Sequence, residues 1–99
     1  MKEIALHFTY DYTIIGVPNN IARSIQQIRK HFDKWLYDRT NDHGYWIVKN
    51  GKKVAVSFGA DTFVDYINQH HLANNAEKAY IVERELQSVP NNCAVTLFF

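Results

Sequence analysis

The sequence is poor in residues that cross-link a chain or divide it into segments. Among its 99 residues there is one cysteine, Cys93, so an internal disulfide is excluded. Two prolines and four glycines leave no flexible linker or low-complexity segment, and the length fits a single domain over residues 1–99. A chain without disulfides suits a reducing compartment, and we expect a cytoplasmic protein.

Long apolar runs and an excess of charge are also missing. No run approaches the roughly 20 apolar residues that span a bilayer, and His7, Thr9 and Asp11 interrupt the N-terminal segment where a signal peptide would be apolar. We therefore expect no membrane partner. Eleven basic and ten acidic residues give a net charge of +1, so no overall field attracts nucleic acid. Nucleic-acid binding would need a local basic patch.

Motifs for catalysis and cofactor binding are absent as well. The five histidines form no HExxH pattern, and the four glycines build no phosphate loop. Cys93 begins a predicted core strand without a basic neighbour that would activate its thiol. We expect structural or solvent-exposed roles for the histidines, no bound metal, no cofactor and no catalytic residue. A non-enzymatic protein is therefore favoured over an enzyme.

Strong periodicity is what the sequence does contain. In residues 3–15, EIALHFTYDYTII, apolar and polar side chains alternate, which predicts one long β-strand. At about 3.3 Å per residue, this strand would be longer than a domain of this size. It must therefore bend near Tyr10–Asp11, or Tyr10–Ile15 must contact a partner.

Helices are predicted from apolar stripes. The stripe that begins at Ile21 predicts a helix over residues 19–38. A second helix is expected to begin near Asp61 or Thr62, with Asp65 completing a capping box. Residues 76–88 fit both types of structure: Tyr80–Val82 favours a strand, but the helical stripe and the helix-forming composition favour a helix. The first stripe consists of Ile21, Ile25, Ile28, Phe32 and Trp35.

A β-hairpin is predicted over residues 45–58. Asn50–Gly51 is the preferred pair for a type I′ turn, which pairs Lys49 with Lys52 and Ile47 with Val54. Alternation then divides the side chains between two faces. One face carries Tyr45, Ile47, Val54, Val56 and Phe58, and the other carries Trp46, Val48, Lys53 and Ala55. Residues 93–99 read as a last strand.

The resulting order, β-α-β-β-α-α-β, predicts an α+β two-layer sandwich with a mainly antiparallel sheet and helices on one face. If residues 76–88 form a strand, the order becomes β-α-β-β-α-β plus a C-terminal strand. That alternative is close to the ferredoxin-like arrangement. Some nucleases with that arrangement carry a metal-binding aspartate near the end of the first strand, where Asp11 lies.

The favoured function is a small protein-interaction module. It would act as a homodimer or as a stoichiometric binder, such as an inhibitor, an immunity protein or an antitoxin-like protein. If the helices cover the other face of the hairpin, Trp46 and Val48 form an exposed apolar patch, and such patches mark interfaces. Together with Tyr10 and Tyr12, they are the predicted partner-binding residues.

The alternative function is nucleic-acid binding through residues 45–53. Aromatic side chains can stack on bases while lysines contact phosphates. A metal-dependent nuclease centred on Asp11 is an extension of this alternative. The residues involved in binding would be Tyr45, Trp46, Lys49, Lys52 and Lys53.

Overall fold

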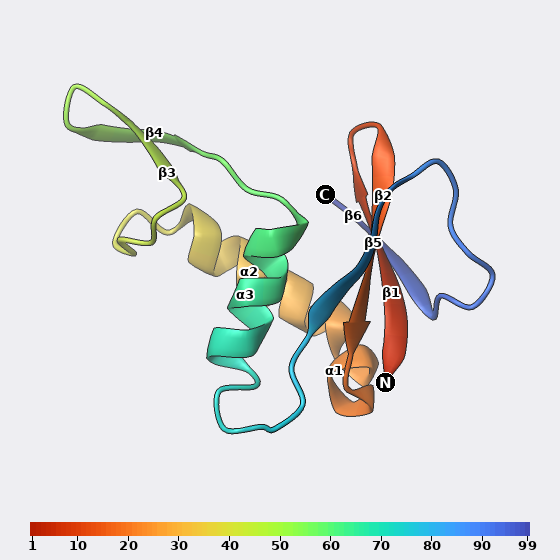
Figure 1. The fold of residues 1–99 in the computed structure, drawn as a ribbon. Helices are drawn as coiled ribbons and strands as arrows, with labels where there is room; N and C mark the ends of the chain where they lie inside the picture. Colours follow the sequence, from red (N-terminus) through yellow and green to blue (C-terminus); the bar gives the residue numbers. More distant parts are fainter.

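The computed structural model describes residues 1–99 as two layers, with three helices on one face of a mixed four-stranded sheet (Figure 1). This arrangement confirms the predicted α+β two-layer sandwich, and most strand pairs are antiparallel. The elements are β1 (Lys2–Phe8), β2 (Asp11–Val17), α1 (Asn19–Arg23), α2 (Ile25–Tyr37), β3 (Trp46–Lys49), β4 (Lys52–Val56), α3 (Ala60–His70), β5 (Tyr80–Leu86) and β6 (Val95–Phe98).

The predicted single strand over residues 3–15 is wrong, because the chain reverses within it. β1 and β2 form an antiparallel hairpin in which Phe8 faces Asp11. Thr9 adopts a φ of 44°, a left-handed conformation that lets the chain turn back. The bend expected near Tyr10–Asp11 is thus a full reversal, one residue earlier. No glycine, asparagine or proline marks this turn, so the alternation reads through it.

The main sheet has the strand order β5-β2-β1-β6, with β6 parallel to β1. The helix favoured over residues 76–88 is wrong, because β5 occupies this segment and pairs with the open edge of β2. Glu85 has a φ of 59° at a point where the register between β2 and β5 is irregular. The ferredoxin-like alternative also does not hold, because β3 and β4 form a separate two-stranded sheet.

The helices cover the sheet with the stripes that the sequence predicted. Ile21, Ile25, Ile28 and Phe32 are buried, although the helix is divided into α1 and α2 at Ser24. Leu36 rather than Trp35 ends the fully buried stripe.

The second helix, α3, begins within two residues of its predicted start. The Gly59 amide donates to Thr62 Oγ1 at 3.1 Å, so Thr62 caps from inside the helix and Asp65 takes no part in the cap. None of the three helices is long and apolar enough to cross a bilayer.

An aromatic cluster around Phe32 joins helices α2 and α3 to the C-terminus of the chain, which follows β6. The Phe32 ring has no exposed surface, and four rings lie edge-on to it at centroid distances of 5.1–6.2 Å. These rings belong to Phe58, Phe63, Tyr66 and Phe99. Because these rings come from the loop before α3, from α3 itself and from the C-terminus, the cluster ties α2 to parts of the chain that are distant in sequence.

The face of the sheet opposite the helices is crossed by the connection from β5 to β6 (Figure 1). This segment is anchored to β1, since the Ala94 amide donates to the Glu3 carbonyl at 2.9 Å. The alternation of side chains along a strand directs Ala5 and Ile14 to this side of the sheet, and both are nevertheless buried. The half-buried rings of His7 and Tyr12 lie 4.7 Å apart here. This helix-free face is therefore partly covered.

His71, which directly follows α3, is expected to make stability depend on pH. Its ring lies beside that of Tyr66, and burial, followed by the charges of His31 and His70, lowers the pKa of His71 below its ordinary value. As pH falls through the ordinary histidine value, the unfolded chain takes up this proton before the folded chain does. Stability is therefore lost as the pH falls. His71→Gln should reduce the dependence of the free energy of unfolding on pH.

The measurement is the free energy of unfolding from urea titrations between about pH 7 and pH 5. The wild-type slope under identical conditions is the reference. A variant that keeps the full wild-type slope would contradict this assignment.

Candidate functional site

The hairpin of β3 and β4, residues 46–56, projects away from both layers and is referred to below as the arm (Figure 1). Ile47, Val48 and Val54 on it are 41%, 56% and 50% exposed. Single exposed apolar residues are ordinary on a protein surface, whereas a group of aliphatic side chains on one projection is typical of a contact surface. The arm is therefore the first candidate for a functional site.

The tip of the arm has the predicted geometry. Asn50 and Gly51 have φ values of 53° and 74°, as a type I′ turn requires, and Lys49 pairs with Lys52. The register then shifts by one residue, so that Ile47 pairs with Ala55 and not with Val54 as predicted. Val54 is thus the extra residue of a β-bulge and has no partner on β3.

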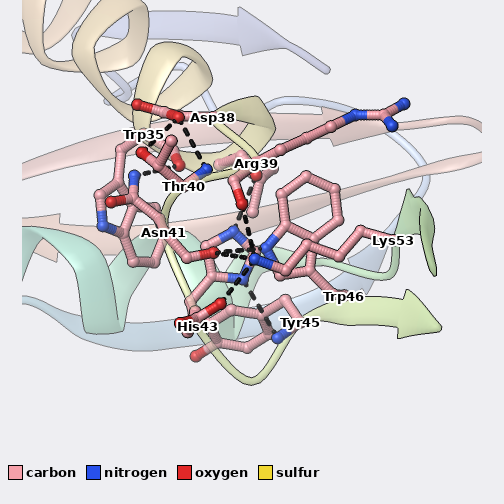
Figure 2. Close-up of polar contacts among 11 residues, drawn as sticks. Trp35, Asp38, Arg39, Thr40, Asn41, His43, Tyr45, Trp46 and Lys53 are labelled. Atoms are coloured by element: carbon pink, nitrogen blue, oxygen red, sulfur yellow. Dashed lines mark hydrogen bonds and ion pairs between the residues drawn. The ribbon is translucent and has the colours of Figure 1, made fainter. Parts of the chain in front are cut away.

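Lys53 lies next to the tip residue Lys52, and its long side chain fastens the arm to the loop that follows α2 (Figure 2). Its Nζ donates to the carbonyl oxygens of Arg39 at 2.6 Å and Asn41 at 3.2 Å, and forms an ion pair with Asp42 at 2.6 Å. Hydrogen bonding and charge attraction from Lys53 lower the pKa of Asp42. All three ammonium protons have partners, so this lysine is engaged within the protein.

Trp46 forms the second attachment of the arm (Figure 2). The indole N–H donates to the Asn41 carbonyl at 2.7 Å, and the ring stacks on His43 with centroids 5.0 Å apart and planes 9° apart. The Lys53 ammonium lies 5.5 Å from the indole centroid, within cation–π range. Trp46 therefore holds the arm in one orientation.

His43 connects this stack to the body of the domain. Its Nε2 lies 2.7 Å from the Leu36 carbonyl, which can only accept, so Nε2 carries the proton. Nδ1 then accepts from the Tyr45 amide at 3.3 Å. The other side of the ring packs against Trp35 at 4.7 Å. The imidazole thus bridges α2 and the start of β3.

The loop before His43 is held by its own side chains. The Asp38 carboxylate accepts from the amide and hydroxyl of Thr40 at 3.0 and 2.7 Å, and these bonds lower the pKa of Asp38. The Asn41 side chain donates to the Trp35 carbonyl at 2.9 Å. Because these bonds order the loop, the carbonyl oxygens that receive Lys53 and Trp46 have fixed positions.

The structure separates the residues predicted to bind a partner. Val48 is exposed on the arm, while Trp46 is half-buried at its base. Tyr10 is 88% exposed at the turn of the β1–β2 hairpin, and Tyr12 lies half-buried against His7 on the helix-free face. These four residues therefore do not make one patch.

The residues of the nucleic-acid alternative are divided in the same way. Lys49 and Lys52 are exposed at the tip of the arm. Tyr45 is half-buried and its hydroxyl donates to Asp65 at 3.4 Å, while Trp46 and Lys53 are engaged with the loop that follows α2. Asp11 opens β2, and no group of three or more histidine, cysteine, aspartate or glutamate side chains is placed to hold a metal ion.

Sequence reasoning missed two parts of this site. The sequence predicts a covered face for Ile47 and Val54, but the hairpin projects away from the layers and both side chains are exposed, which no local pattern indicates. The role of His43 and Asn41 was also missed, since their contacts join segments that only the fold brings together. Comparison of the chain with protein-family models, with curated proteins and with solved structures finds no match.

Proposed function

We propose that this chain is a small non-enzymatic protein-binding module that uses the arm as its contact element. The single observation that carries the proposal is that Ile47 and Val48, on opposite faces of β3, and Val54 on β4 are all exposed on a projection that is held at its base. A two-stranded hairpin is at best marginally stable alone in water. The attachments at its base therefore pre-order a surface that would otherwise lose entropy on binding.

The chemistry of the arm describes its partner. Aliphatic side chains lie along the arm, and Lys49 and Lys52 at its tip have no acidic partner within the protein. An apolar groove bordered by carboxylates on another protein complements both features. Such a groove is the partner that we propose.

The alternative of nucleic-acid binding has weaker support from the same contacts. Lys53 is saturated by Arg39, Asn41 and Asp42, and the indole face of Trp46 is stacked on His43. Two lysines at the tip remain for phosphates. Exposed aliphatic side chains gain little free energy from contact with a phosphate backbone. An apolar groove on a protein therefore suits more of the exposed residues of the arm.

Site-specific photo-crosslinking tests the proposal. A photoreactive side chain at position 48 should capture one protein from an extract of the source cells. The same group at position 82, a valine of β5 that is 41% exposed, is the matched control and should not capture it. The purified captured protein should bind Val48→Ser about tenfold more weakly than wild type, and Lys49→Glu should also weaken binding.

Two other occupants are separate outcomes of the same experiment. If the photoreactive group captures a second copy of this chain and sedimentation equilibrium shows a dimer, the partner of the arm is the chain itself and not another protein. Binding of short single-stranded RNA at low salt, where phosphate contacts are strongest, would favour the nucleic-acid alternative if Lys49→Glu on the arm weakens it. Equal capture from positions 48 and 82, or unchanged binding by Val48→Ser, would overturn the proposal.

A further inference from the structure

A second site lies at the opposite end of α3 from the arm. A cavity of about 350 Å³ opens between the α1–α2 segment and His71, which follows α3. Asn20, Ser24, Gln27 and His31 border it. Their spacing of three or four residues places these side chains on one side of the helical segment. Their amide, hydroxyl and imidazole groups form a polar row.

The floor of the cavity is apolar. Ile21 and Ile28 line it, and both are buried in the core. No lysine, arginine, aspartate or glutamate borders the cavity. A ligand suited to it therefore has an apolar body with several hydrogen-bonding groups and no need for a counter-charge.

Two imidazole rings define the shape of the site. The rings of His31 and His71 are stacked with planes 5° apart and centroids 6.5 Å apart. A flat ring between them needs two aromatic contacts of about 3.5 Å each, or about 7 Å in total. The centroids of the two rings are about 0.5 Å closer than this span, and rotation of the exposed His31 side chain adjusts both the separation and the overlap of the rings.

The ring nitrogens bond in the ring planes and take no part in stacking. His71 Nε2 is buried and has no hydrogen-bond partner within the protein, so this ring offers a ligand its face alone. His31 Nε2 lies 3.2 Å from Gln27 Nε2, so the Gln27 amide donates to it. A metal ion suits this arrangement poorly, because imidazole binds metals in the ring plane whereas these rings present their faces.

We propose that this cavity binds a nucleobase-sized, flat heteroaromatic ring inserted between His31 and His71. Stacking on the two imidazoles holds the ring. The polar row formed by Asn20, Ser24 and Gln27 hydrogen-bonds to the polar atoms at the edge of the ring. This function is independent of the arm and of any protein partner. The ring can belong to a free nucleoside or to a base of a single-stranded nucleic acid, since both offer the same chemistry.

The test is a titration of the whole chain followed by NMR of the histidine ring protons. Adenosine and uridine are the probes, and ribose, which has no aromatic ring, is the control ligand. We expect saturable upfield shifts of the His31 and His71 ring resonances with the nucleosides and none with ribose. His31→Ala and His71→Ala should each weaken binding about tenfold.

His70→Ala is the matched control, because His70 stacks on Tyr66 at 4.6 Å and does not border the cavity. It should leave the affinity unchanged. His71→Asn, which keeps a polar group but lacks the imidazole face, should weaken binding like His71→Ala and guards against loss of folding. A short single-stranded oligonucleotide that binds more tightly than its nucleosides would identify nucleic acid as the source, and equal affinity would identify the nucleoside.

The proposal is overturned if neither nucleoside shifts both histidines at millimolar concentration. It is also overturned if a folded His71→Asn variant binds as well as wild type. Because none of these readouts involves the arm, failure here leaves the protein-binding proposal standing, and failure of that proposal leaves this one standing.

Discussion

Phe32→Ala is expected to lower the free energy of unfolding by about 3–5 kcal/mol. The ring has no exposed surface and lies edge-on to Phe58, Phe63, Tyr66 and Phe99. Its removal loses apolar burial and leaves a cavity whose walls belong to three different segments that cannot easily close together. Single domains are stabilised by roughly 5–15 kcal/mol, so this change removes a large part of the total.

Urea denaturation followed by far-UV circular dichroism measures this loss. Phe98→Ala is the matched control, because this ring is 66% exposed on the helix-free face. Arg29 bonds to the main-chain carbonyl of Phe98, and that acceptor is retained in the variant. The control should cost less than about 1 kcal/mol. Equal losses in the two variants would show that the core is not centred on Phe32.

Trp46→Ala is expected to release the arm while leaving the body folded. The variant loses the hydrogen bond from the indole to Asn41 and the stack on His43. Together these contacts contribute about 2 kcal/mol locally, which corresponds to about 30-fold faster exchange of the arm amides. The amides of α2 and of the β1–β2 hairpin should exchange as in wild type, because their protection reports global unfolding.

Hydrogen exchange read by mass spectrometry distinguishes this local effect from a global one. Val48→Ser is the control, since it changes the exposed surface of the arm without touching its attachments. Its exchange should match that of wild type. If Trp46→Ala accelerates exchange throughout the chain, the tryptophan belongs to the core and does not serve as an attachment of the arm.

Local periodicity predicted the covered faces of the elements more reliably than their boundaries. Ile21, Ile25 and Ile28 are buried because a 3.6-residue stripe has one way to meet a sheet. The reversal at Thr9 was not predictable in this way, since its residues carry no turn preference. The helix over residues 76–88 was favoured over the strand, because the pairing with the open edge of β2 that selects the strand involves residues distant in sequence.

The candidate site was predicted in part for the same reason. Asn50–Gly51 specifies its turn locally, so the tip of the arm followed from the sequence. The engagement of Lys53 depends on carbonyl oxygens of a loop more than ten residues away, which no local pattern encodes. The cavity at His31 and His71 likewise requires α2 and the end of α3 to be placed side by side.

The parallel pairing of β6 with β1 has a consequence for how the domain folds. Ile4 pairs with Val95, so this contact joins positions near opposite ends of the chain. The hairpins and helices can form from neighbouring residues, but this pairing must first overcome the entropy of closing a loop that contains nearly everything else. Until β6 arrives, Leu97 is missing from the core and one edge of β1 stands open. The docking of this strand is therefore the step at which folding and aggregation compete.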